Sequence, residues 1–512
     1  MALCLLPISV FALPRPIPAS AAPDISGAPA PGESFTLQSH APDTQVLILG
    51  GGVAGIIAAR KLAAEGITNF LIVEARDELG GRMRSATFGA PKRQLTVEVG
   101  ANWIHGTQEH DGPANPMFEL ALKHNIKTTE SHLHTSITTY DANGAVDYLD
   151  LVHDAMDAYT QLTIVAGARL SENLVDLTAR AGYALVGQKP KTLHEMASEY
   201  YSFDYTYAQT PEQSSFLASA WNSNFTYEVD QGGFSDEDLL SIDQRGIKSL
   251  IQAEAAEFLK QSQVRLQATV ATIGYSDSGV SVTLTDGTKL TAQYAICTFS
   301  VGVLQNDDVQ FSPPLPEWKV EAIHSLTMAT YTKIFIQFPQ KFWFDTEVAL
   351  YADRERGRYP LWMSLDLDGF MPGSGVIVAT VTGDFSKRIE AMTDARVQSE
   401  VMGVLQTMFP RVSIPEPTAF FFQRWFSDPL YRGSYSTWPA SFIPQHLINL
   451  GASLGNLWFA GEATSEKYFG YLHGAYFEGE AAASQIVQCI KDQQRHPQPP
   501  ILYAQNTYPY NL

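Results

Sequence analysis

The 512-residue sequence predicts an α/β fold, with α+β character overall, and three observations carry that prediction. A short apolar run at residues 45–49 leads directly into a glycine-rich turn and an amphipathic segment, which is the pattern of a buried parallel strand followed by a helix. Residues 113–235 show mainly helical periodicity. Alternating segments at 264–273, 279–285 and 289–298 predict strands, the last two joined by a polar, glycine-containing hairpin turn.

Composition favours a protein with a large buried interior. Hydrophobic residues make up 45% of the chain, aromatic residues 11% and charged residues only 17%. Extensive buried surface is therefore expected, with an aromatic-lined ligand site as one interpretation. The formal net charge of −20 argues against a nucleic-acid partner, whose phosphates would be repelled. The same charge would attract a cationic ligand, although solubility alone would also account for it.

Residues 1–40 are expected to be a secretory signal peptide or a disordered leader. The apolar stretch Ala2–Leu13 and the A-x-A site at 19–21 are typical of a signal, whereas no Lys or Arg precedes the stretch. An extracellular location is therefore expected, and the sequon at Asn224 agrees with it. No stretch of the chain is apolar for long enough to form a membrane-spanning helix. The three cysteines indicate neither a disulfide framework nor a metal site.

The glycine-rich turn after the first strand fits G-x-G-x-x-G and has the context of a dinucleotide-binding unit. Gly50 permits the tight turn, Gly52 lets the backbone approach a pyrophosphate, and Gly55 allows close packing of helix on strand. The helix that follows presents unpaired N–H groups to phosphate. Glu74 ends the next apolar strand, where a carboxylate can accept hydrogen bonds from ribose hydroxyls. This order predicts a Rossmann-type domain.

The segments after Glu74 resemble the flavin-containing amine oxidases, and most closely the polyamine oxidases. Residues 74–83 read E-A-R-D-E-L-G-G-R-M, and residues 100–103 read G-A-N-W. The resemblance implies that Gly81 and Arg82 bind the FAD diphosphate. It also implies that Ala101, Asn102 and Trp103 run beside the isoalloxazine ring.

The middle of the chain adds two positions to this resemblance. Val270 falls where the family holds the adenine with backbone groups. Lys333 lies in the motif M-A-T-Y-T-K-I-F, and periodicity alone would favour a lysine on an edge strand or one that reaches solvent. The family instead places a lysine here that holds a water against flavin N5, which implies that role for Lys333.

The C-terminal segments resemble the second half of the same flavin site. In the family's R-W-x-x-D…G-x-[YF]-S segment, Trp425 would pack near the flavin, and Tyr435 would form one wall of an aromatic cage. Monoamine oxidases attach the flavin to a cysteine at the position of Ser434, so the FAD is expected to be non-covalent. The remaining family positions are Gly461 and Glu462 for the diphosphate and ribityl end, Tyr471 for the second cage wall, and the Leu472 backbone for the pyrimidine edge.

These motifs imply an interleaved organisation, in which a Rossmann-type FAD-binding domain alternates along the chain with a substrate-binding domain of mixed sheet and helices. The FAD-binding domain would comprise 43–115, 236–310 and 440–495, the substrate-binding domain 116–235 and 311–439, and the C-terminal tail 496–512.

The resemblance implies an FAD-dependent polyamine oxidase with Lys333, Tyr435, Tyr471 and His105 at the reacting end. Spermine, spermidine or their N-acetyl forms would be oxidised by O2 at a C–N bond to an aldehyde, a smaller amine and H2O2. Two departures from the plant enzymes leave the amine open. His105 stands where they have an acid, as in animal polyamine oxidases, and Thr206 replaces a second acid. A purely structural loop histidine remains an alternative for His105.

Several other functions are compatible with the same flavin site. An L-amino-acid oxidase or an oxidase of a specialised amine would share the cofactor motifs, and so would a flavin-binding protein without turnover. A histone-lysine demethylase shares the catalytic domain, but it would need an added helical module for which the chain has no space.

Overall fold

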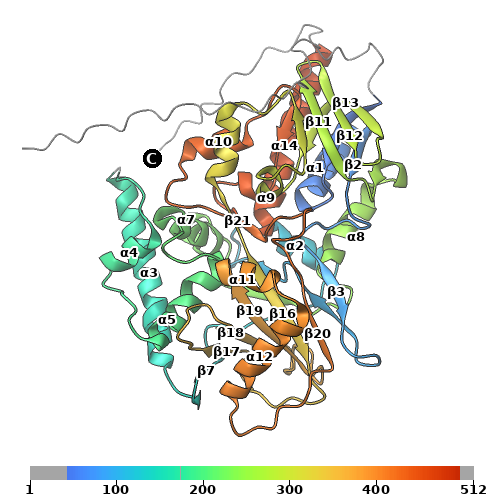
Figure 1. Ribbon diagram of the computed structural model, residues 1–512. Coiled ribbons are helices and arrows are strands. Elements are labelled where there is room, and N and C mark those ends of the chain that lie inside the picture. Colours follow the sequence, from blue (N-terminus) through green and yellow to red (C-terminus); the bar gives the residue numbers. More distant parts are fainter. Residues whose placement is uncertain (1–42, 173, 496–512) are drawn as a thin grey trace, which may run out of the picture. The chain divides into compact units, whose positions relative to one another are not determined.

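The computed structural model describes residues 43–172 and 174–495, and it contains two large sheets. The first sheet has the order β10-β2-β1-β13-β12-β11-β14, with β22 also paired to β13 (Figure 1). Its strands are β1 (Thr44–Leu49), β2 (Phe70–Val73), β10 (Val264–Arg265), β11 (Val270–Ser276), β12 (Gly279–Leu284), β13 (Lys289–Cys297), β14 (Gln310–Ser312) and β22 (Leu457–Phe459).

The centre of the first sheet is parallel, and its register brings four strand ends to one edge. Leu49 pairs with both Val73 and Cys297, and Cys297 pairs with Phe459. The carboxyl ends of β1, β2, β13 and β22 therefore lie side by side, which is where open α/β sheets bind their ligands. Segments more than 400 residues apart in sequence meet at this edge.

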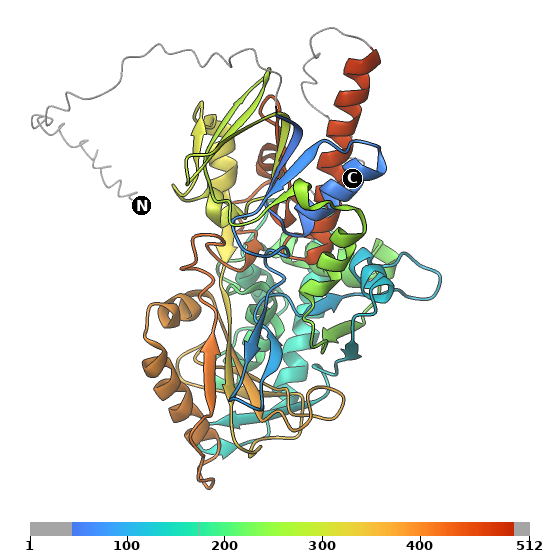
Figure 2. The same cartoon turned by 90° about the vertical axis from the view of Figure 1, so that its right-hand side faces the viewer.

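Two helices that start at this edge pack tightly against each other. Helix α1 (Val53–Ala64) follows β1, and helix α14 (Leu472–Arg495) follows β22 (Figure 1, Figure 2). Apolar residues of α1, α14 and the central strands share one buried cluster. The fold thus directs the N-termini of two helices toward the same edge of the sheet.

The second sheet has the order β20-β16-β19-β18-β17-β7-β8 and is covered on both faces. Along β19 the buried residues alternate: Val376 and Val378 face one core, while Ile377, Ala379 and Val381 face the other. Helices α3 and α5 contribute to the first core, and α11 and α12 to the second (Figure 1, Figure 2). The strands are β7 (Ile137–Asp141), β8 (Gly144–Ala145), β16 (Tyr331–Gln337), β17 (Val348–Tyr351), β18 (Leu361–Ser364), β19 (Val376–Thr382) and β20 (Ala419–Phe422). The helices are α3 (Leu149–Ser171), α5 (Leu193–Glu199), α11 (Gly383–Glu390) and α12 (Asp394–Met408).

Smaller elements connect the two sheets. They form three small sheets. In the first, β3 (Ser85–Phe88) pairs with β4 (Leu95–Glu98); in the second, β9 (Asp238–Ser241) lies between β5 (Trp103–His105) and β6 (Thr128–Glu130); in the third, β15 (Thr327–Ala329) pairs with β21 (Tyr435–Thr437). Further helices are α2 (Pro116–Lys123), α4 (Ala179–Leu185), a π-helix (Tyr200–Asp204) continued by α6 (Tyr205–Tyr207), α7 (Phe216–Tyr227), α8 (Lys248–Phe258), α9 (Val301–Leu304), α10 (Glu317–Ser325) and α13 (Pro444–Gly451).

The α/β fold class predicted from the sequence is confirmed, and two local expectations need correction. The strand expected at 264–273 is two strands, because β10 pairs with β2 whereas β11 pairs with β12. The helical reading of 113–235 missed β6, β7 and β8, whose ladder partners include β17, about 200 residues further along the chain. Such distant pairing leaves no periodic signal in a short segment.

The predicted leader at 1–40 and the tail at 496–512 lie outside the described residues, and both stay predictions. In the part of the chain that is described, no helix is both long and apolar enough to cross a bilayer.

Candidate active site

The glycine turn between β1 and α1 is confined on all sides. Gly50 has a φ of +114°, and a Cβ atom there would lie 2.3 Å from Thr298 Oγ1. A Cβ atom on Gly55 would lie 2.0 Å from the carbonyl oxygen of Gly50. A side chain at Gly55 would push the helix away from the strand, and one at Gly50 would clash with Thr298, which follows β13. The glycines therefore hold the N-terminus of α1 close to the end of β1.

Glu74 is placed beside this turn by the end of β2. The residue is 7% exposed, and its carboxylate accepts hydrogen bonds from Gly51 N–H at 2.7 Å and from Arg76 N–H at 2.8 Å. A carboxylate has about four acceptor sites. Glu74 can thus bind the turn and still accept hydrogen bonds from two hydroxyl groups.

Arg82 joins the N-terminal motifs to the C-terminal motifs. Its Nη1 donates to Glu462 Oε1 at 2.8 Å and to the carbonyl oxygen of Ser434 at 3.1 Å. The preceding Gly81 lies against Gly52, because a Cβ atom on Gly81 would be 3.0 Å from Gly52 Cα. Glu462 is buried and also accepts hydrogen bonds through Oε2, from Ser436 Oγ and from Gly470 N–H.

These groups line one cavity of about 920 Å³, which continues from the glycine turn into an aromatic region. Every residue that the sequence assigned to the cofactor or the substrate lines this cavity, except Gly55, which packs against the turn instead. Those predicted to bind the cofactor are Gly50, Gly52, Glu74, Gly81, Arg82, Ala101, Asn102, Trp103, Val270, Trp425, Gly461, Glu462 and Leu472. Those predicted for the reacting end are His105, Lys333, Tyr435 and Tyr471.

The two tyrosines of the expected cage are each fixed by contacts. Tyr435 lies in β21, and its hydroxyl donates to the carbonyl oxygen of Thr206 at 2.9 Å. Tyr471 stacks on His473, with ring centroids 4.9 Å apart and planes at 15°. The Tyr471 ring also contacts His105, at 5.2 Å and 62°, and its hydroxyl is hydrogen-bonded to Tyr227 and Thr226. Burial raises the pKa of both tyrosine hydroxyls, so they remain neutral.

Lys333 points from β16 into the strand-to-loop segment that carries G-A-N-W. Its Nζ donates to the carbonyl oxygens of Glu98 at 3.0 Å and Gly100 at 2.6 Å, and to Asn102 Oδ1 at 2.6 Å. Burial lowers the pKa of Lys333 to about 7, although the nearby Glu98 carboxylate opposes that shift. The three donors of the ammonium all meet protein oxygens. Lys333 therefore holds this loop, and it could hold a water only by exchanging one of these bonds.

Comparison with known proteins identifies the family. The model of the flavin-containing amine oxidoreductases matches residues 53–487. This chain belongs to that family. It is 34% identical to polyamine oxidase 1 of Zea mays over 474 residues, which cover 87% of this chain and 91% of the relative. It is 33% identical to polyamine oxidase 6 of Oryza sativa subsp. japonica, with the same coverage. Lysine-specific histone demethylase 1B of Mus musculus is 28% identical, and there the match covers 54% of the relative.

FAD is the cofactor of this family, and the residues of the cavity fit it. The glycine turn, the approach of Gly81 to Gly52 and the N-terminus of α1 form a backbone cradle suited to a diphosphate. Glu74 has free acceptor sites for ribose hydroxyls. At the position where some relatives carry a cysteine, Ser434 Oγ accepts from Tyr331 N–H and donates to the Tyr331 carbonyl. That position therefore offers a hydroxyl and no sulfur for a covalent link.

Several residues of the aromatic region escaped the sequence analysis. Tyr331 contacts Tyr435 and Tyr205 through ring centroids 6.2 Å and 5.8 Å apart. Its position two residues before Lys333 on the same strand could have revealed it, because such residues share a face. Asp238 and Tyr227 also line the cavity and contact His105. Nothing in the sequence links Asp238 to His105, because their strands meet only in the folded sheet.

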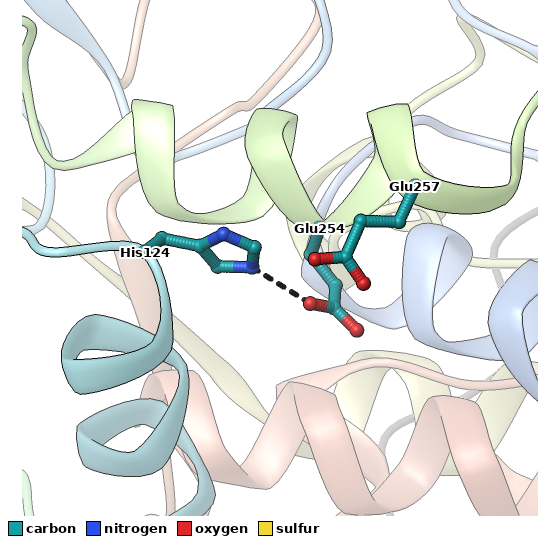
Figure 3. A group of neighbouring side chains, drawn as sticks. All are labelled: His124, Glu254 and Glu257. Carbon is teal, nitrogen blue, oxygen red and sulfur yellow. Dashed lines mark hydrogen bonds and ion pairs between the residues drawn. The ribbon is translucent and has the colours of Figure 1, made fainter.

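A separate cluster of His124, Glu254 and Glu257 has ligand atoms within 4.8 Å of one another (Figure 3). Lys123 Nζ lies 2.6 Å from a carboxylate oxygen of each glutamate, and Arg60 Nη1 lies 2.9 Å from Glu254. Although burial raises the pKa of Glu254, hydrogen bonds from its cationic neighbours lower it to about 2. The lysine thus already balances this charge, and the cluster ties α1, α2 and α8 together.

Proposed function

We propose that this FAD-dependent amine oxidase acts on polyamines. The observation that carries the proposal is the chemistry of the aromatic end of the cavity. Tyrosines surround the region beside the flavin residues, and three carboxylates from one segment, Glu228, Asp236 and Asp238, line the same cavity. Carboxylates suit the charged ends of an extended polyamine, and aromatic faces suit its apolar chain and a neutral reacting nitrogen. The names of the plant relatives agree with this chemistry.

The residues at the reacting end would bind and orient the amine. The faces of Tyr435 and Tyr471 would direct the reacting nitrogen toward the flavin and favour its neutral form, because an apolar surface disfavours a bare charge. Once bound, FAD supplies the oxidation, taking two electrons from the amine and passing them to O2. Lys333 keeps the G-A-N-W loop in place beside the ring through its bonds to Gly100 and Asn102.

An L-amino-acid oxidase is disfavoured by the charges of the cavity. A substrate carboxylate would need a free cation, yet each lysine or arginine that lines the cavity in the described residues is engaged. Arg82 is bound to Glu462, Arg76 lies 3.6 Å from Asp428, and Lys333 is bound to backbone and Asn102. The carboxylates at the aromatic end would repel such a substrate.

Anaerobic addition of substrate tests the proposal directly. Spermine, spermidine or one of their N-acetyl forms should bleach the visible flavin band, and readmitted O2 should restore it with release of H2O2. A free L-amino acid should leave the band unchanged. If no polyamine bleaches the flavin, the polyamine assignment is wrong. Bleaching by an amino acid alone would favour the L-amino-acid oxidase instead.

A further inference from the structure

His105 and Asp238 face each other across an antiparallel ladder. In the pairing of β5 with β9, His105 lies directly opposite Asp238, and Ile104 lies opposite Leu239. Residues opposite each other on one face of such a ladder have Cβ atoms about 5 Å apart, so their side chains interact. Here His105 Nδ1 lies 3.2 Å from Asp238 Oδ1. The same carboxylate oxygen also accepts from the Gly106 N–H at 3.3 Å.

Besides its hydrogen bond to Tyr471, Tyr227, the last residue of α7, contacts both members of this pair. Its hydroxyl lies 2.9 Å from His105 Nδ1 and 3.4 Å from Asp238 Oδ2. Burial, together with the charge of Asp238, raises the pKa of Tyr227, so its hydroxyl keeps its proton. The tyrosine can therefore donate to one carboxylate oxygen while the imidazole donates to the other.

This geometry favours one tautomer of His105. A protonated Nδ1 can donate to Asp238 Oδ1 and to the Tyr227 hydroxyl oxygen, which lies closer. An unprotonated Nδ1 could accept from that hydroxyl, but it would also turn its lone pair toward the carboxylate of Asp238, which is repulsive. With the proton on Nδ1, Nε2 is left as an acceptor. Within the described residues no protein group bonds to Nε2, and the histidine side chain is 32% exposed in the wall of the cavity.

We propose that Asp238 is a positioning residue that fixes His105 with Nε2 as a hydrogen-bond acceptor for a distal ammonium group of the substrate. The proposal rests on the proposed function and names the subsite of that same cavity. His105 lies beside Tyr471 in the cavity wall, so an ammonium bound to Nε2 would lie next to the expected cage and would be a different nitrogen from the one that reacts between its walls. The Asp238 carboxylate adds a negative charge beside the imidazole. The pair thereby replaces a single acid as the group that recognises a cation.

The matched variants are Asp238→Asn and Glu237→Gln. Both remove one negative charge from the same segment. Glu237 accepts a hydrogen bond from Thr107 Oγ1 at 2.6 Å, which a glutamine oxygen can also accept. Spermidine is compared with N-methylbutylamine, which has a secondary amine and no distal ammonium. Anaerobic flavin reduction gives a dissociation constant and a limiting rate for each amine.

We expect Asp238→Asn to weaken spermidine binding about 10-fold or more, as for a hydrogen bond to a charged group, with the limiting rate changed less than about 3-fold. Binding of N-methylbutylamine should be unchanged, and Glu237→Gln should resemble the wild type for both amines. Because Asp238 acts through His105, Asp238→Asn should add little to His105→Ala in the double variant. A merely structural aspartate would affect both amines alike.

The proposal is overturned if Asp238→Asn weakens the binding of both amines equally or leaves the binding of spermidine unchanged. It is also overturned if the effect of Asp238→Asn on spermidine binding adds fully to that of His105→Ala in the double variant. Failure of the polyamine function itself is seen separately, because the wild-type flavin would then not be reduced by spermidine. In that case the same variants are compared by the shift of the visible flavin band on spermidine binding, which needs no turnover. Absence of any shift in the wild type would overturn the proposal as well.

Discussion

At the residue scale, Lys333 combines burial with charge beside the predicted cofactor site. Lys333 lies in the largely apolar strand β16. Its ammonium makes three hydrogen bonds to the segment 98–102. Burial nevertheless lowers its pKa from 10.5 to about 7. The bonds therefore compensate the loss of water only in part, and the stability of the protein should depend on the protonation of this group.

The sign of that dependence follows from where the proton binds. Below about pH 7 both the folded and the unfolded chain hold the proton, and the folded state bears the full cost of the buried charge. Between about pH 7 and 10.5 the folded lysine is neutral while the unfolded one still binds a proton. Lys333 therefore destabilises the fold most at low pH, and its cost fades as the pH rises.

Replacement of this lysine by methionine should reveal the effect. The difference in melting temperature, wild type minus Lys333→Met, should increase between pH 6.5 and 9.5, with a limit of about 1.4 kcal/mol per pH unit in free energy. Thermal unfolding in excess FAD at several pH values measures it. A difference that stays constant with pH, or one that shrinks as the pH rises, would show that the lysine is charged throughout.

Single residues were predictable where the sequence motif around them indicates their role. Gly50, Glu74 and Arg82 followed from spacing or from family resemblance, and all three line the cavity. Asp238 was not predictable, since its partner His105 is brought near only by a ladder between distant segments. The three hydrogen bonds of Lys333 could not be predicted either. The sequence shows that the lysine lies in an apolar strand, but it does not show which acceptors surround the ammonium.

At the element scale, the contact of α1 with α14 couples the two halves of the cofactor site. A Cβ atom on Gly479 of α14 would lie 2.2 Å from the carbonyl oxygen of Ala54 in α1. The backbones of the two helices thus approach as closely as glycine allows. Because the N-terminus of α1 adjoins the glycine turn, displacement of α1 should disturb cofactor binding as well as packing.

We expect Gly479→Ala to lower the melting temperature and to weaken retention of FAD. Overpacking of this kind costs about 1–3 kcal/mol, which the better helix propensity of alanine offsets by about 1 kcal/mol. The matched control is Gly403→Ala in α12, where a Cβ atom would meet nothing within 4 Å. That variant should bind FAD normally and be as stable as the wild type or slightly more so. Equal behaviour of the two variants would contradict the close approach.

Strong elements were foreseen more readily than weak ones. Helix α1 and the hairpin of β12 with β13 followed from periodicity and turn chemistry, and α2 and α3 lie in the region where helical periodicity was expected. The break between β10 and β11 did not, because both segments read as strand and only their different partners separate them. The domain boundaries expected from the sequence stay predictions.

At the scale of the whole molecule, 54 acidic side chains exceed 34 basic ones and give a net charge of −20. Such a charge repels anions and attracts cations over a distance set by the salt concentration, about 30 Å at 0.01 M and about 8 Å at 0.15 M. The cavity wall carries carboxylates of its own, including Asp236 and Asp238, and Asp238 contacts His105. A polycation would therefore be drawn first to the molecule and then to the site.

This steering predicts a salt dependence that scales with substrate charge. The value of kcat/KM for spermine should fall roughly 10-fold between 10 mM and 500 mM NaCl, because screening removes the long-range attraction. The value of kcat/KM for N-methylbutylamine, which carries one positive charge, should fall far less. The value of kcat should change little for either amine. Steady-state H2O2 production over a series of salt concentrations measures both slopes. Equal slopes for the two amines would mean that salt acts on the protein itself and not on the approach of a charged substrate.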